Sequence, residues 1–205
     1  MFSWRKSYFQ ADASLKRACS LFRRDLGAAA TIEFVLLAPV ILSMLALIVA
    51  GGEGFEVNRK VTMVVRTLAD LASQQQNLKS TSVTVSGTTI PAGTYTATQI
   101  LSAASLVIAP YDSTQLSLVL SEVSANGSGS GTVVWSQANG NGTALSVGSS
   151  VTVPSNITTS GYLILGAASY NFAPLQIFLP MAAFPITDSL YLAPRTGTIG
   201  VQCCS

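Results

Sequence analysis

Residues 28–50, which read AAATIEFVLLAPVILSMLALIVA, decide the fold. These 23 residues carry one charge, Glu33, and the 17 residues that follow it carry none. As an α-helix the stretch is about 34 Å long, enough for the hydrocarbon core of a bilayer, which is about 30 Å thick. The alternative is a core helix of a soluble domain, but such cores rarely need an apolar run this long on every side of a helix. The stretch therefore predicts a transmembrane helix.

Charge is distributed unevenly on the two sides of this helix. Residues 1–26 hold six Lys or Arg against two acids, a balance of +4, whereas the rest of the chain holds five against seven, a balance of −2. Basic residues flank a membrane helix on its cytoplasmic side, so we expect a cytoplasmic N-terminus and a single pass, with everything after Gly51 across the membrane. The apolar run exceeds a secretory h-region and no A-x-A site stands out after it, which favours a signal anchor or a prepilin-type leader.

The next segment, residues 51–79, predicts an amphipathic helix. Gly51, Gly52 and Gly54 interrupt the apolar run, weaken a helix and could act as a joint. Apolar residues then recur at three- and four-residue intervals, the period of a helix with one buried face. They are Val57, Val61, Val64, Val65, Leu68, Leu71 and Ala72. A coiled coil and a membrane-surface helix are the alternatives for this segment.

Residues 80–205 predict a β-rich domain with an antiparallel sheet. Short runs rich in β-branched and aromatic residues alternate with Asn-Gly and Ser-Gly clusters, and we expect 126–131 and 139–142 to be hairpin loops. One helix is expected over residues 96–109, ended by Pro110. The fold class is therefore α+β: a long N-terminal transmembrane and amphipathic helix followed by a β-rich globular head.

The residues around the start of the apolar run resemble the leader of type IV prepilins, most closely the TadE-like proteins of the tight-adherence (Flp-type) pilus. The matching residues are Arg23, Arg24, Gly27, Glu33 and Phe34. The resemblance continues to residue 74, through Arg59-Lys60 and the run at 67–71, and more weakly at 168–175 and Pro194-Arg195. It implies a leader, residues 1–27, that a prepilin peptidase removes. Glu33 is sixth after Gly27 and fifth after Ala28, so cleavage after either residue is open.

The resemblance implies a minor pilin or pseudopilin of the bacterial inner membrane, with its β-rich domain in the periplasm. The implied partners are other pilins, the prepilin peptidase, the inner-membrane assembly platform and membrane lipid, with no nucleic acid. Whether the chain enters the extracellular fibre is open. A buried carboxylate is costly unless it is paired, so we expect Glu33, beside Phe34, to meet the newly formed terminal amine of a neighbouring chain and set the axial register.

Composition argues against catalysis. The chain has no histidine, which removes the usual general base and the usual zinc ligand, and we expect no catalytic residue, no metal and no cofactor. Cys19 belongs to the leader. For Cys203 and Cys204, a vicinal disulfide, an intermolecular bridge and two free thiols are all open. An uncleaved single-pass binding protein is the main alternative function, and a tethered hydrolase has no support beyond abundant serine.

Overall fold

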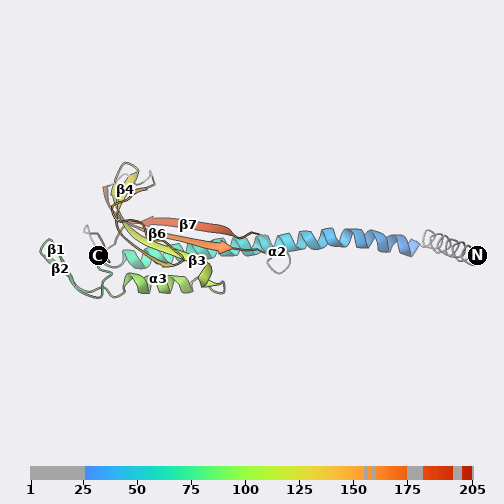
Figure 1. Cartoon of the computed structure of the whole chain (residues 1–205), viewed down its shortest axis with the longest axis horizontal. Helices are drawn as coiled ribbons and strands as arrows, with labels where there is room; N and C mark the ends of the chain where they lie inside the picture. The colour runs from blue at the N-terminus through green and yellow to red at the C-terminus, as the bar shows by residue number, and fades with distance from the viewer. Residues whose placement is uncertain (1–25, 155–156, 158–159, 175–181, 196–199, 205) are drawn as a thin grey trace, which may run out of the picture. The chain divides into compact units, whose positions relative to one another are not determined.

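The computed structural model describes residues 26–154, 157, 160–174, 182–195 and 200–204, with side chains described from residue 30 onward. The chain divides into two compact units, Met1–Gly51 and Gly52–Ser205. We call the second unit the head. The fold class is the predicted one, because one long apolar helix precedes an antiparallel sheet domain (Figure 1). The basic residues Arg23 and Arg24, and Cys19, lie outside the described residues.

Helix α2 runs continuously over Leu26–Ser73 and contains Pro39. The expected interruption at Gly51, Gly52 and Gly54 does not break it, because each glycine costs a helix only about 1 kcal/mol relative to alanine. Nothing lies within 4 Å of the positions that a Cβ would take at Gly51 and Gly52, so packing does not require glycine there. The boundary between the two units nevertheless falls between these two glycines.

Within the head, the amphipathic pattern of α2 is confirmed. Its buried positions are Val57, Val61, Val64, Val65, Leu68 and Ala72, and Leu71 is half-buried. The helix ends at Ser73, six residues before the expected end. The reason is Asn77, whose buried side chain donates to the carbonyls of Thr81 (2.8 Å) and Pro91 (3.1 Å) and accepts from the Lys79 N–H (2.8 Å). An asparagine side chain that bonds nearby backbone groups offers the chain an alternative to helix.

Two small elements follow. Strands β1 (Val83–Val85) and β2 (Thr88–Ile90) form a hairpin whose turn residues, Ser86 and Gly87, have positive φ. Helix α3 spans Ala97–Leu106, within the predicted 96–109, and begins with a capping box between Thr96 and Gln99. It ends before Pro110, and the short 3-10 helix η1 (Ser113–Gln115) leads into the sheet.

The main sheet has five antiparallel strands in the order β5-β4-β3-β6-β7. The bounds are β3 Leu116–Asn126, β4 Ser130–Gly140, β5 Ser150–Thr152, β6 Ser160–Phe172 and β7 Phe184–Leu192. The predicted hairpin at 126–131 is confirmed, with Gly127 and Gly129 at positive φ between β3 and β4. The predicted hairpin at 139–142 is confirmed as well: the Gly142 N–H donates to the Asn139 carbonyl at 3.2 Å, and the chain returns antiparallel along β4 until β5 pairs with its first residues. Packing also requires glycine at this turn, because a Cβ at Gly142 would lie 2.6 Å from the Leu118 carbonyl oxygen.

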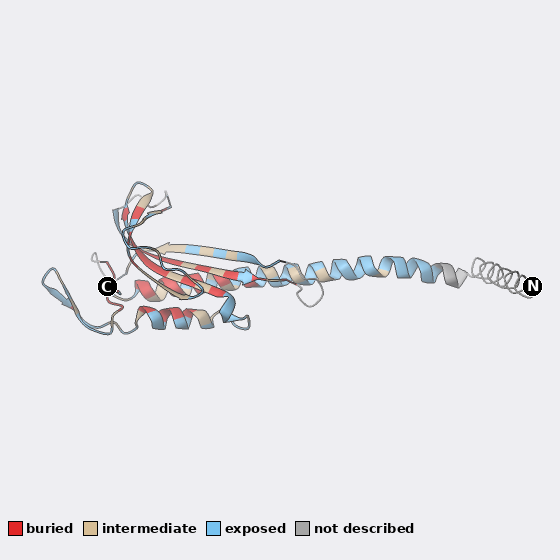
Figure 2. Ribbon diagram, viewed as in Figure 1, coloured by how far each residue is buried: buried red, intermediate tan, exposed pale blue. Residues whose placement is uncertain are grey.

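The principal core lies between one face of the sheet and the helices α2 and α3, which carry buried residues where they face it (Figure 2). Gly166 on β6 allows the closest approach, since a Cβ there would be 3.2 Å from the Val65 carbonyl oxygen and 3.4 Å from Ala69 Cβ. A second, smaller cluster lies on the opposite face around Val123, Val153 and Leu163. The head therefore has its own core on both sides of the sheet.

Among the described residues, β7 is an edge of the sheet, and its sequence discourages pairing with another chain. Pro185 lacks a backbone N–H, and Asp188 is half-buried between Ile186 and Leu190, which pack on the principal core. A proline and an inward-facing charge on an edge strand are devices that protect edges against aggregation.

Candidate functional site in the exposed apolar helix

The most unusual surface of the described chain is the apolar part of α2, residues 30–50. Its large side chains are exposed on every side of the helix, as the mostly pale blue ribbon shows (Figure 2). They include Ile32, Phe34, Val35, Leu36, Leu37, Val40, Ile41, Leu42, Met44, Leu45, Leu47, Ile48 and Val49. Water does not favour an apolar surface of this extent, and such patches mark sites of contact with membranes or other proteins.

This helix is long and apolar enough to cross a membrane. Its most apolar 18-residue window has a mean hydropathy of 2.7, and the described residues bury none of that window. The apolar helix thus differs from a core helix, which is the alternative that the sequence left open. Because a core helix is covered by its own protein, full exposure favours lipid or other helices as its surroundings.

Glu33 lies exposed on this helix, at its N-terminal end, beside Phe34, which is 68% exposed. Gly27 and Ala28 belong to the first turn of α2, and the structure describes their backbone only. At 1.5 Å per residue, Glu33 lies about 9 Å along the axis from Gly27 and about 7.5 Å from Ala28. The residues predicted to take part in leader cleavage, Gly27 and Ala28, and those predicted to set the axial register, Glu33 and Phe34, therefore all lie at the N-terminal end of α2.

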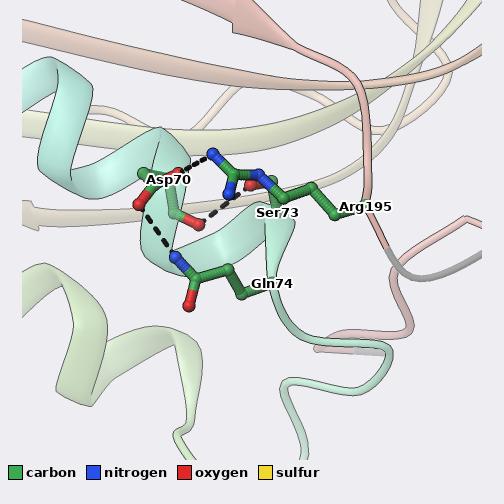
Figure 3. Close-up of polar contacts among 4 residues, drawn as sticks. All are labelled: Asp70, Ser73, Gln74 and Arg195. Carbon is green, nitrogen blue, oxygen red and sulfur yellow. Dashed lines mark hydrogen bonds and ion pairs between the residues drawn. The ribbon is translucent and has the colours of Figure 1, made fainter.

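Two other segments singled out by the resemblance meet on the surface of the head (Figure 3). The Arg195 guanidinium forms an ion pair with the Asp70 carboxylate at 2.5 Å, and Gln74 Nε2 donates to the same carboxylate at 2.8 Å. The Arg195 N–H also donates to the Ser73 carbonyl at 2.9 Å. Since both charged side chains are largely exposed, the ion pair itself stabilises by less than about 1 kcal/mol. Its effect is to position the chain after β7 against the end of α2.

The C-terminal cysteines occupy different environments although they are adjacent. The structure places their sulfur atoms in contact, and the three arrangements considered above all stay predictions. Cys203 is buried in the principal core, whereas Cys204 is exposed and has a positive φ. Nothing in this arrangement suggests catalysis.

Sequence reasoning missed the buried carboxyl of Glu122. Glu122 is 1% exposed, accepts from Val201 N–H at 2.5 Å and accepts from Trp135 Nε1 at 3.0 Å. Burial raises its pKa from 4.5 to about 7, against the two hydrogen bonds, which lower it. The sequence does contain a pattern that predicts this burial. Glu122 follows Leu116, Leu118 and Leu120 at two-residue spacing, so it lies on the same face of β3 as these core residues.

The described residues hold no group of three or more His, Cys, Asp or Glu side chains that could bind a metal ion. Among the depressions on the surface of the described residues, two are shallow and open, with volumes of about 380 and 400 Å³. The first lies on the sheet and is lined mainly by small Ser, Thr and Ala side chains with Asp188, and the second lies beside Cys204 and the start of α3.

Comparison with models of known protein families, with curated proteins and with solved structures finds no match to this chain. Function therefore has to be argued from the residues and the geometry.

Proposed function

We propose that the protein is a structural component of a tight-adherence pilus system, a minor pilin or pseudopilin, and not an enzyme. One observation carries this proposal: the apolar helix is exposed on all sides, yet has a carboxylate at its N-terminal end. The resemblance of residues 23–74 to TadE-like proteins supports the same interpretation. The proposed location is the bacterial inner membrane, with residues 1–27 in the cytoplasm and the head in the periplasm.

In the proposed mechanism, a prepilin peptidase cleaves after Gly27 or Ala28 and liberates an α-amine close to the cytoplasmic interface. The apolar helix packs with the helices of other pilins on the inner-membrane assembly platform. In a parallel bundle, the Glu33 carboxylate of one chain meets the terminal amine of a neighbour that is staggered along the axis. Each charge then compensates the other where an unpaired charge is costly, so the pair selects one axial register.

The decisive test is the mature N-terminus. We expect intact-mass measurement of the membrane-extracted protein to show the loss of about 27 residues, the length of the proposed leader, in cells that contain the prepilin peptidase. The same measurement in cells that lack the peptidase should show the full 205-residue chain. A full-length chain in both strains would contradict the proposal and favour an uncleaved single-pass binding protein.

A second prediction concerns Glu33→Ala. We expect this variant to remain in the membrane fraction, because it makes the helix more apolar, but to lower the yield of assembled pili by about tenfold or more. A charge-assisted hydrogen bond contributes about 1.5–3 kcal/mol, and 1.4 kcal/mol corresponds to tenfold. Pili sheared from cells and quantified by immunoblot provide the measurement. Glu56→Ala is the matched control, since Glu56 is exposed beyond the apolar run, and equal yields from the two variants would contradict the pairing.

A further inference from the structure

The last described residues, Gly200–Cys204, form a strap across the head. The Leu78 N–H donates to the Gln202 carbonyl at 2.7 Å, and the Gln202 N–H donates to the Gln76 carbonyl at 3.0 Å. Val201 is 1% exposed, and its carbonyl accepts from Trp135 Nε1 at 2.7 Å. The strap is thus attached to the segment after α2 on one side and to the sheet on the other.

Glu122 lies beneath this strap and is the acceptor for its central amide. The Val201 N–H donates to Oε1, while the Trp135 indole is shared between Oε2 and the Val201 carbonyl. Gly200 fits above the carboxyl only because it has no side chain: a Cβ there would lie 2.5 Å from Oε1. A contact this close leaves no room for water between the carboxyl and the strap.

Among the residues that the structure describes, no charged group offsets the burial of Glu122. Its cross-strand neighbours are Trp135 on β4 and Ile164 on β6, and β4, α3 and the rest of β3 carry no charged residue. On β6 the titratable groups are Tyr162 and Tyr170, and on the adjoining end of α2 they are Arg66 and Asp70, the latter paired with Arg195. The segment after α2, to which the strap is attached, carries Lys79. None of these groups contributes to the pKa of Glu122, which reflects burial and the two hydrogen bonds alone.

We propose that the Glu122 carboxyl is a proton-controlled latch, which holds the C-terminal strap when it is protonated and loosens it when it is ionised. Ionisation places an uncompensated charge under the strap, and lifting the strap gives that charge access to water. This inference concerns the head alone and does not depend on the proposed role in a pilus.

The direction of the pH dependence follows from the pKa values of the two states. With the strap docked, the pKa of Glu122 is about 7, and with the strap lifted it returns toward its ordinary value of 4.5. Between these values the docked state binds the extra proton, so raising the pH through this window favours the lifted state. Docking is therefore complete at acidic pH and weakest above about pH 7.

Hydrogen exchange on the full chain in detergent micelles tests the latch. The readout is the protection factor of the Val201 and Gln202 amides, followed by mass spectrometry of the C-terminal peptide. In the wild type we expect protection to fall on the order of tenfold or more between pH 5 and pH 8, as the linkage requires. In Glu122→Gln we expect the same protection at both pH values. The protection factors of this variant should be lower than those of the wild type at pH 5. The reason is that the side-chain NH₂ of the variant replaces a carboxyl oxygen and so faces one of the two hydrogen-bond donors, the Val201 N–H or Trp135 Nε1, without accepting from it.

Two further variants keep the test decisive. Glu56→Gln removes an exposed acid of the head and should retain the wild-type pH response. Gly200→Ala inserts a methyl group against the carboxyl and should lower strap protection at pH 5 while leaving the amides of β3 and β6 protected. A wild type whose strap protection does not change between pH 5 and pH 8, or a Glu122→Gln variant with the wild-type pH response, would overturn the proposal.

Discussion

Replacing Leu37 and Leu45 with arginine is expected to remove the protein from the membrane fraction. Both side chains are more than half exposed on the apolar helix and make no core contact. Arginine near the centre of a transmembrane helix costs about 2.5–3.5 kcal/mol, so the pair costs about 5–7 kcal/mol. The measurement is carbonate extraction of membranes followed by immunoblotting, which should show a shift of nearly all the protein from the pellet to the supernatant.

The matched control replaces the same two leucines with alanine, which shortens the side chains without adding charge. That variant is expected to stay in the pellet, because the remaining run from Phe34 to Ala50 is still uncharged and largely apolar. Retention of the double-arginine variant in the carbonate-resistant pellet would show that the apolar helix does not anchor the chain.

Leu68→Ala is expected to destabilise the head by about 3–4 kcal/mol. Leu68 is fully buried on α2, in the principal core between the helix and the sheet. Truncating a buried leucine loses its transfer free energy and leaves a cavity, and such changes cost about 2–5 kcal/mol. Since a domain is stable by only about 5–15 kcal/mol, this is a large fraction of the total. Urea unfolding of the full chain in micelles, followed by circular dichroism, measures the free energy of unfolding.

Met63→Ala provides the comparison for this prediction. Met63 lies five residues earlier on the same helix and is 39% exposed, so its loss is expected to change the free energy of unfolding by about 0.5 kcal/mol or less. If both variants lost the same stability, the burial of Leu68 would not be what stabilises α2 against the sheet.

Features that depend on neighbouring residues in the chain could be predicted from the sequence. The uncharged run after Glu33 and the three- and four-residue spacing of apolar residues from Val57 onward predicted both halves of α2. The Asn-Gly-Ser-Gly turn between β3 and β4 was predicted in the same way, because Gly127 and Gly129 adopt positive φ without steric cost. Each of these patterns is contained in a short stretch of sequence, either a few helical turns or a single loop.

Features that depend on contacts between distant residues could not be predicted in this way. Gly140 and Gly142 belong to a hairpin turn that the sequence predicted, but only the fold places the carbonyls of Leu116 and Leu118 where a Cβ on either glycine would stand. The end of α2 at Ser73 depends on Asn77, whose side chain reaches the Pro91 carbonyl 14 residues away. The meeting of Asp70 with Arg195 likewise spans 125 residues.

The sequence by itself therefore determined that the chain has one helix able to cross a membrane, an amphipathic continuation and a β-rich domain. These properties follow from hydrophobicity and periodicity, which are local. Only the tertiary structure decided the strand order, the close approach of α2 to Gly166 and the position of Glu122 beneath the C-terminal strap. A carboxyl at an alternating position in a strand is placed in the core by its pattern, but its partners come from Trp135 and Val201, which folding alone brings to it.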